Sequence, residues 1–240
     1  MREEATPLDR GGMLGAVRTQ LAMDPKSTAL VLVDAHRGHL DPGVATMPVA
    51  PEDVPTVRAA LARLVRGARA VGVPVVHVVM THRRIPTEGA ESMTNPFWRA
   101  VEAAHQSLTP GRWSTIRGHN LEGTPQTEIL PELGPEPTDY VILTKKRLSA
   151  FYGTDLEFVL RTRGVSTVLL AGINTNTCVL CTAFDAFNRD YAVVVARDAV
   201  ASMYGPDLHL FGLENVGRCL GWVLTVDEIL ATLGVQAAAG

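Results

Sequence analysis

The stretch TVLLAGINTNTCV at residues 167–179 decides the fold. Its first five residues, 167–171, form an apolar run without polar alternation, which is typical of a strand buried on both faces in a parallel sheet. Gly172 ends the run, and residues 175–177 carry the side-chain oxygens that cap helices. Apolar residues at helical spacing follow from Val179. A strand, a turn and a helix in this order predict one unit of an α/β fold.

Similar apolar runs predict further parallel strands along the chain, at residues 29–33, 73–80, 140–143, 192–196 and, more weakly, 222–224. Helical spacing of apolar residues lies between them, at residues 57–68, 156–160 and 179–187. Strands that alternate with helices predict a three-layer α/β/α fold around a central, mostly parallel six-stranded sheet of Rossmann-like type.

The chain of 240 residues is long enough for one α/β domain, which we expect at residues 26–240. Residues 1–25 form a polar N-terminal extension, expected either to be mobile or to dock on a neighbouring subunit. The segment 81–138 is rich in Pro and Gly, so we expect a loop with one helix at 97–106. A loop of this length is usually functional, as a lid or a subunit contact.

Composition excludes several classes of function. Lys and Arg number 22 against 25 for Asp and Glu, and the net charge of −3 comes without a basic stripe, so a nucleic-acid partner is not expected. Three cysteines argue against a disulfide framework and for a reducing compartment. Since no stretch approaches the roughly 20 apolar residues of a membrane span, and no signal-peptide core is present, we expect a cytoplasmic protein without a membrane partner.

Chemically capable residues follow three of the predicted strands. Asp34, Lys145 and the turn from Gly172 to Cys178 all fall at carboxyl ends, where α/β sheets bind their ligands. A thiol in the first turn of a helix feels the helix dipole and free N–H groups, so we expect the pKa of Cys178 to be lowered. The same N–H groups can hold an oxyanion. Each residue taken alone also has an ordinary structural interpretation: Cys178 as a buried core residue, Asp34 as a helix cap, and Lys145 as a solvated side chain.

The pattern around these residues is more specific. Residues 145–156, KKRLSAFYGTDL, closely resemble the K-x-x-Y/F-S-A-F-x-x-T-x-L segment of the isochorismatase-like superfamily, and residues 172–179 resemble its G-[VI]-x-T-[ND]-x-C-V nucleophile turn. The resemblance runs from about residue 27 to about residue 232. It implies a catalytic triad in which Cys178 attacks a carbonyl carbon, Asp34 transfers the thiol proton, and Lys145 holds both in register.

The same resemblance implies details of the turn and the pocket. A cis peptide is expected between Ile173 and Asn174, with the backbone N–H groups of Asn174 and Cys178 forming the oxyanion hole. His36, Arg37 and Asn174 are candidate pocket residues from their places in the chain. Independently of the resemblance, Trp98 and Trp113 in the long loop are expected either to cover the substrate or to lie in a subunit interface. Arg37, Arg83, Arg84 and Arg117 are candidate carboxylate binders, because arginine can clamp a carboxylate with two hydrogen bonds.

The chain also departs from the family pattern. Ala35-His36 stands where many members have Met-Gln, so the polarity of the pocket differs; His39 is expected to pack or to be solvated. Metal-using nicotinamidases of this superfamily carry a D-x-H signature after the second strand, and residues 81–86 offer no carboxylate there. We therefore expect neither a metal nor another cofactor.

A retained cysteine favours acyl chemistry. The resemblance thus predicts an amidohydrolase that cleaves a non-peptide C–N bond of a small amide, ureide or N-carbamoyl compound. Branches of the superfamily with such substrates act on ureidoacrylate, biuret, N-carbamoylsarcosine and maleamate. The resemblance also implies a homodimer or homotetramer. Three alternatives stay open: an isochorismatase-type vinyl-ether hydrolase that needs no thiol, a catalytically idle binding module, and a redox pair of Cys178 and Cys181.

Overall fold

The computed structural model describes residues 7–83, 95–104 and 114–235. Its centre is a six-stranded sheet in which every neighbouring pair of strands is parallel, in the order β3-β2-β1-β4-β5-β6. The strands are β1 (Thr28–Val33), β2 (Val75–Met80), β3 (Tyr140–Lys145), β4 (Thr167–Ile173), β5 (Ala192–Ala201) and β6 (Gly221–Leu224). The predicted fold class and all six predicted strands are confirmed.

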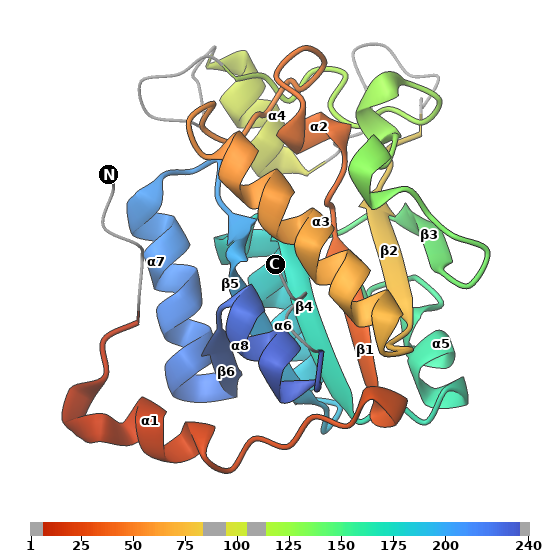
Figure 1. The fold of residues 1–240 in the computed structure, drawn as a ribbon. Coiled ribbons are helices and arrows are strands. Elements are labelled where there is room, and N and C mark those ends of the chain that lie inside the picture. The colour runs from red at the N-terminus through yellow and green to blue at the C-terminus, as the bar shows by residue number, and fades with distance from the viewer. Residues whose placement is uncertain (1–6, 84–94, 105–113, 236–240) are drawn as a thin grey trace.

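Helices cover both faces of the sheet (Figure 1). One face packs against α3 (Val54–Ala70) and α8 (Val226–Thr232), and the other against α5 (Leu156–Thr162), α6 (Leu180–Phe187) and α7 (Pro206–Asn215). Alternate residues of β1 enter opposite cores, and all six are buried. Burial on both faces is the physical reason why the strand sequences lack polar alternation.

Strand β5 is longer than its sequence indicated. The polar pair Arg197-Asp198 suggested an end at residue 196, but a shift in register lets the strand continue beside Gly172 and Ile173 of β4. Asp198 is accommodated because its Oδ1 accepts a hydrogen bond, 2.8 Å long, from the backbone N–H of Val226 at the start of α8. Asp198 therefore caps a neighbouring helix, and the polar pair does not end the strand.

The long segment after β2 contains regular structure beyond the predicted helix. Helix α4 spans Pro96–Ala103 and begins at Asn95, whose side chain accepts from the N–H of Phe97; residues 105 and 106 of the predicted helix lie outside the described residues. Two short 3-10 turns follow at Pro125–Thr127 and Pro131–Leu133. Isolated bridges join Ile129 to His36 and Leu121 to His82, so this segment lies over the strand ends.

The described part of the N-terminal segment lies against its own chain. It contains a 3-10 turn at Arg10–Gly12, helix α1 (Met13–Arg18) and a second 3-10 turn at Pro25–Ser27. The indole Nε1 of Trp222 in β6 donates to the carbonyl of Val17 over 3.0 Å, and Arg18 pairs with Glu228 at 2.7 Å. Among the described residues, no helix combines the length and apolarity that crossing a bilayer requires.

Candidate active site

Three strand ends meet at the upper edge of the sheet in Figure 1. Asp34 directly follows β1, Lys145 is the last residue of β3, and Asn174 directly follows β4. Strands β1 and β4 are neighbours, and the chain passes from β1 to β2 and β3 on one side before it returns to β4 on the other. This is the position at which open α/β sheets bind their ligands.

Lys145 joins the other two predicted catalytic residues. Its Nζ lies 2.6 Å from Oδ2 of Asp34 and 3.5 Å from Sγ of Cys178. The second carboxylate oxygen of Asp34 accepts from the N–H of Met80 at 2.7 Å, so β2, which separates β1 from β3, also holds the carboxylate. Asp34 and Lys145 are 0% exposed and Cys178 is 4% exposed. The structure therefore brings all three side chains together in a desolvated cluster.

The charges of Asp34 and Lys145 stabilise each other. Burial by itself would raise the pKa of Asp34, but the ammonium of Lys145 outweighs it and the pKa lies below its ordinary value. Burial by itself would lower the pKa of Lys145, but Asp34 and Cys178 raise it. Near neutral pH the pair is therefore a carboxylate and an ammonium ion.

The thiol of Cys178 behaves differently from what its position in the chain suggested. Burial raises the pKa of Cys178 to about 12, an effect that Lys145 opposes and Asp34 reinforces. The expectation of a lowered pKa is thus wrong for the resting site, because loss of hydration disfavours the thiolate more than local positive charge favours it. The resting site holds a protonated thiol beside an ionised carboxylate that can accept its proton.

The turn before Cys178 has a constrained backbone. Gly172 has a φ of +117°, and a Cβ at this position would lie 2.0 Å from the carbonyl oxygen of Val33 in the adjacent strand, so only glycine fits. The peptide bond between Ile173 and Asn174 is cis, as predicted. The side-chain Oδ1 of Asn174 accepts from the N–H of Met203 at 2.9 Å, which ties the turn to the segment after β5.

The residues after this turn form one π-helical turn, Thr175–Val179, which leads into α6. The predicted helix therefore begins with a wider turn than an α-helix has. The backbone N–H groups of Thr177 and Val179 both donate to the carbonyl oxygen of Asn174 at 3.1 Å, so this turn closes on the residue that follows the cis peptide.

Thr182 links the two sequence motifs. Its Oγ1 donates to the carbonyl of Cys178 at 2.7 Å and accepts from the N–H of Ala150 at 3.0 Å. Thr182 and Ala150 are both fully buried. The segment after Lys145 and the helix after Cys178 are therefore held together by one hydroxyl group.

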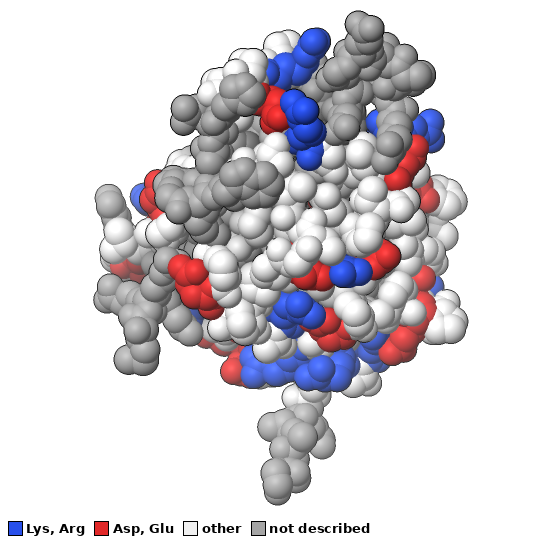
Figure 2. Space-filling model, turned by 90° about the horizontal axis from the view of Figure 1, so that it is seen from above, with Lys and Arg blue, Asp and Glu red and all other residues white. Residues whose placement is uncertain are grey.

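A cavity of about 780 Å³ opens above Cys178. Trp98 and Asn174, two of the predicted pocket residues, line it, whereas Trp113 lies outside the described residues. Figure 2 looks down on this side of the molecule, where Lys, Arg, Asp and Glu side chains of both signs lie around a centre of uncharged residues. Further lining residues include Met47, Met80, Leu148, Tyr152, Phe184 and Tyr204. The wall is thus largely apolar and aromatic.

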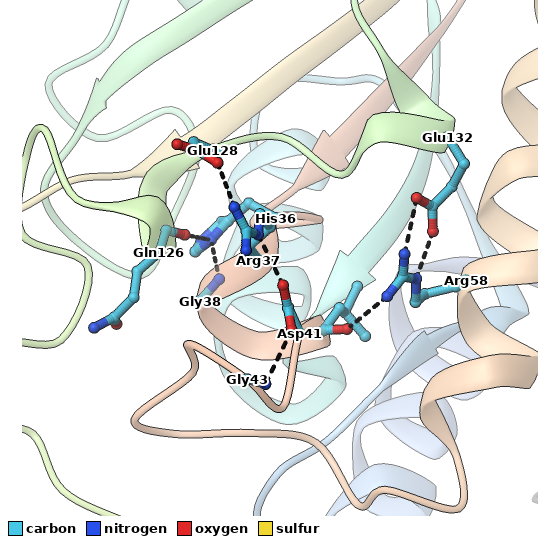
Figure 3. Close-up of polar contacts among 10 residues, drawn as sticks. His36, Arg37, Gly38, Asp41, Gly43, Arg58, Gln126, Glu128 and Glu132 are labelled. Carbon is cyan, nitrogen blue, oxygen red and sulfur yellow. Dashed lines mark hydrogen bonds and ion pairs between the residues drawn. The ribbon is translucent and has the colours of Figure 1, made fainter.

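Two predicted pocket residues lie outside this wall. His36 is completely buried, and its Nδ1 lies 2.6 Å from the carbonyl oxygen of Gln126 and 3.0 Å from the backbone nitrogen of Gly38. Arg37 pairs with Asp41 at 2.8 Å and with Glu128 at 2.5 Å (Figure 3). Neither residue is among those that line the cavity. The guanidinium of Arg37 already binds two carboxylates of its own chain, which leaves it no position for a substrate.

The cavity is lined instead by three histidines that were not predicted as site residues: His39, His82 and His119. The ring centroids of His39 and His119 lie 5.0 Å apart, and those of His82 and His119 lie 6.4 Å apart. Burial lowers the pKa of each, to about 4 for His82, so all three are neutral near pH 7. In the described part of the chain, no group of three or more His, Cys, Asp or Glu side chains is arranged to hold a metal ion.

Among the described residues, the other charged side chains of the wall are Lys146, Arg147 and Asp185. From the sequence, Lys146 and Arg147 had no role beyond their place in the 145–156 motif. Their place directly after a catalytic strand end was the signal that could have identified them, since residues at that edge face the ligand.

Comparison with known proteins identifies the family of this chain. Residues 28–228 match the family model of the isochorismatase domain. The ureidoacrylate amidohydrolase RutB of Methylobacterium radiotolerans is 33% identical over 242 residues, which cover 95% of this chain and 88% of that protein. The chain therefore belongs to the isochorismatase family, as its motifs predicted.

Solved structures share the fold. A cysteine hydrolase from Pseudomonas syringae pv. phaseolicola matches with a TM-score of 0.71 and 23% identity, over 89% of this chain and 95% of that chain. The N-carbamoylsarcosine amidase from Thermoplasma acidophilum matches with a TM-score of 0.61 and 25% identity, over 84% of this chain and 97% of that chain.

Proposed function

We propose that Cys178 carries an acyl group while the protein hydrolyses the C–N bond of a small amide, ureide or N-carbamoyl compound. The protein is a cysteine-dependent hydrolase that acts on C–N bonds other than peptide bonds. Relatives named as ureidoacrylate amidohydrolase and N-carbamoylsarcosine amidase support the reaction class. The observation that carries the catalytic assignment is the position of Lys145, within 2.6 Å of Asp34 and 3.5 Å of Cys178 in a buried cluster.

The first half of the reaction uses the resting protonation states. The thiol proton passes to the Asp34 carboxylate while Sγ attacks the carbonyl carbon, since a thiol with a pKa of about 12 is deprotonated only as its new bond forms. The carbonyl oxygen becomes an oxyanion, which the N–H groups of Asn174 and Cys178 stabilise. Asp34 then gives its proton to the leaving nitrogen, the C–N bond breaks, and ammonia or an amine departs.

The second half restores the enzyme. A water molecule gives a proton to Asp34 and attacks the thioester carbon, and the oxyanion forms again at the same two N–H groups. As this intermediate collapses, the C–S bond breaks and Sγ recovers the proton from Asp34. Lys145 keeps its charge throughout and favours the ionised carboxylate at the start of each half-reaction.

Ammonia release from a panel of small amides, ureides and N-carbamoyl acids tests this function. The variant Cys178→Ala is expected to lose at least about a thousandfold of the activity, because the nucleophile is gone. Cys181→Ala is the matched control: this thiol also lines the cavity, lies three residues along, and should be dispensable. Ammonia release by Cys178→Ala would refute the acyl-enzyme, whereas no ammonia release from any compound by the wild type would favour the ether hydrolase that needs no thiol. A Cys181→Ala that is equally inactive would favour a redox pair.

We also propose a homodimer or homotetramer in a reducing, cytoplasmic compartment, with one domain at residues 26–240. Exposed aromatic side chains on and near α5 and α6 support self-association: Tyr152, Phe158, Phe184 and Phe187. Three free cysteines support the reducing compartment. Light scattering coupled to size-exclusion chromatography distinguishes monomer, dimer and tetramer by mass.

A further inference from the structure

Two cations stand side by side in the cavity wall above Cys178. The ammonium of Lys146 donates to the carbonyl oxygen of Thr81 at 2.6 Å and to its hydroxyl at 2.5 Å. The guanidinium of Arg147 donates once, from Nη1 to the carbonyl of Lys146 at 2.8 Å. All of these acceptors are neutral. Within the described ranges, neither cation has a carboxylate at ion-pair distance.

The arginines that the sequence suggested as carboxylate binders differ in this respect. Arg37 is paired with Asp41, Arg83 lies 3.9 Å from Glu122, and Arg117 lies 3.1 Å from Glu102. Arg84 lies outside the described residues. Arg37 and Arg117 are hydrogen-bonded to carboxylates of their own chain and have spent the paired donors that a second carboxylate would need. Arg83 is too far from Glu122 for a hydrogen bond, but it does not line the cavity. Toward the described residues, Arg147 uses only one of its donors, on a neutral carbonyl.

The other charged groups of the cavity do not neutralise Lys146 and Arg147. Asp185 lies in the wall, but Arg189 pairs with it at 3.2 Å. Glu122 attracts the ammonium of Lys146 but does not line the cavity. Asp34 and Lys145 cancel each other, and the histidines are neutral. The charge that a ligand meets in the described wall is therefore positive.

We propose that Arg147, assisted by Lys146, binds a carboxylate of the substrate at the wall of the cavity while the scissile carbonyl lies at Cys178. The inference rests on the proposed function and narrows it: the substrate is a small acid with a carbamoyl or amide group, in preference to a neutral amide. The planar guanidinium matches a carboxylate with two parallel hydrogen bonds, and the exposed position of Arg147 leaves its free N–H groups accessible. The aromatic side chains Trp98, Tyr152 and Phe184 contact the body of such a molecule.

Alkylation of Cys178 tests the anion site without knowledge of the substrate. Iodoacetate and iodoacetamide react in the same way, with displacement of iodide by sulfur, but only iodoacetate carries a negative charge. The ratio of their rates at one cysteine cancels the fraction of thiolate, because both reagents meet the same thiol. Mass spectrometry of the peptides gives this ratio at Cys178 and, in the same chain, at the exposed Cys219.

The ratio of iodoacetate to iodoacetamide rates is expected to be about tenfold or more higher at Cys178 than at Cys219, since a charge-assisted pair of hydrogen bonds is worth roughly this factor. Arg147→Gln should remove most of the difference, whereas Arg117→Gln, an exposed arginine outside the cavity, should leave it unchanged. An unchanged iodoacetamide rate at Cys178 shows that Arg147→Gln is folded. Equal ratios at the two cysteines, or a ratio insensitive to Arg147→Gln, would overturn the proposal.

A second measurement separates this proposal from the function itself. For an acid that the wild type hydrolyses, Arg147→Gln is expected to raise KM about 10- to 100-fold, and for its methyl ester less than about twofold. If Arg147→Gln changes KM equally for the acid and for its methyl ester, the proposed hydrolase function stands and the proposed carboxylate site is refuted. If the iodoacetate to iodoacetamide ratio is raised at Cys178 but no compound is hydrolysed, the proposed function is refuted and the proposed carboxylate site stands.

Discussion

Lys145 Nζ lies 2.6 Å from Asp34 Oδ2, and neither side chain is exposed to solvent. The two ions have exchanged their hydration for each other, so the removal of one leaves the other buried and uncompensated. Because Lys145 also contacts the Cys178 sulfur, this pair connects the stability of the domain to its chemistry.

Asp34→Asn is expected to lower kcat/KM by about 10²- to 10⁴-fold, the usual contribution of a positioned general base. It should also destabilise the fold by about 3–5 kcal/mol, because Lys145 keeps a buried charge. Urea denaturation and the ammonia assay measure the two effects. The double variant with Asp34→Asn and Lys145→Met is the control: the amide oxygen still accepts from the N–H of Met80 and no charge stays buried, so it should regain stability and stay inactive. A double variant less stable than Asp34→Asn would contradict the account.

Gly172→Ala is expected to cost more than about 4 kcal/mol or to prevent folding, because its Cβ would lie 2.0 Å from the Val33 carbonyl oxygen. Gly72→Ala is a matched control, since Gly72 also has a positive φ, +76°, but has open space around it. This control should cost only about 1 kcal/mol, the strain of the left-handed backbone. Similar losses of unfolding free energy in the two variants would refute the steric account.

Thr182→Val is expected to destabilise the protein by about 1–3 kcal/mol, because it leaves the buried N–H of Ala150 without an acceptor. It should also lower kcat, since Cys178 and the segment after Lys145 lose their common hydrogen bond. Thr232→Val removes the same kind of hydroxyl bond to the carbonyl four residues earlier, on an exposed helix end, and should change the unfolding free energy by less than about 0.5 kcal/mol. Equal effects at Thr182 and Thr232 would show that burial does not matter.

The stability of the protein is expected to fall as the pH drops below 6.5. Burial lowers the pKa of His36 to about 3 and that of His82 to about 4, so these rings stay neutral in the folded state while the unfolded chain takes up protons. Their stabilising contribution is therefore complete above pH 6.5 and is lost as the pH falls toward 4 and 3. Thermal unfolding at a series of pH values measures this loss.

His36→Asn tests one of these rings, because an amide can hydrogen-bond to the Gln126 carbonyl without titrating. The variant should reduce the slope of unfolding free energy against pH by up to about 1.4 kcal/mol per pH unit between pH 6 and 4. The slope above pH 7 should not change. An unaltered slope below pH 6 would mean that His36 titrates normally in the folded protein.

Local pattern was enough to predict the sheet and to group Asp34, Lys145 and Cys178 at one edge of it, and the family resemblance added their proposed catalytic roles. Buried parallel strands need unbroken apolar runs, and the carboxyl ends of such strands converge, so Asp34, Lys145 and Cys178 could be grouped before any coordinates. The cis peptide at Ile173–Asn174 came from the family motif and is also present. These features depend on short-range order along the chain, which the sequence displays directly.

Side-chain surroundings were decided only by the tertiary structure. Cys178 seemed activated by its helix, but burial raises its pKa, and burial depends on what packs above it. Arg37 follows the catalytic strand, yet Glu128 and Asp41 draw it away from the cavity, whereas Arg147 keeps its donors. Desolvation and ion pairing act between residues far apart in the chain. The sequence alone therefore predicted the strands and the Asp34, Lys145 and Cys178 cluster, and the packed fold decided which other residues line the cavity and which of them are charged.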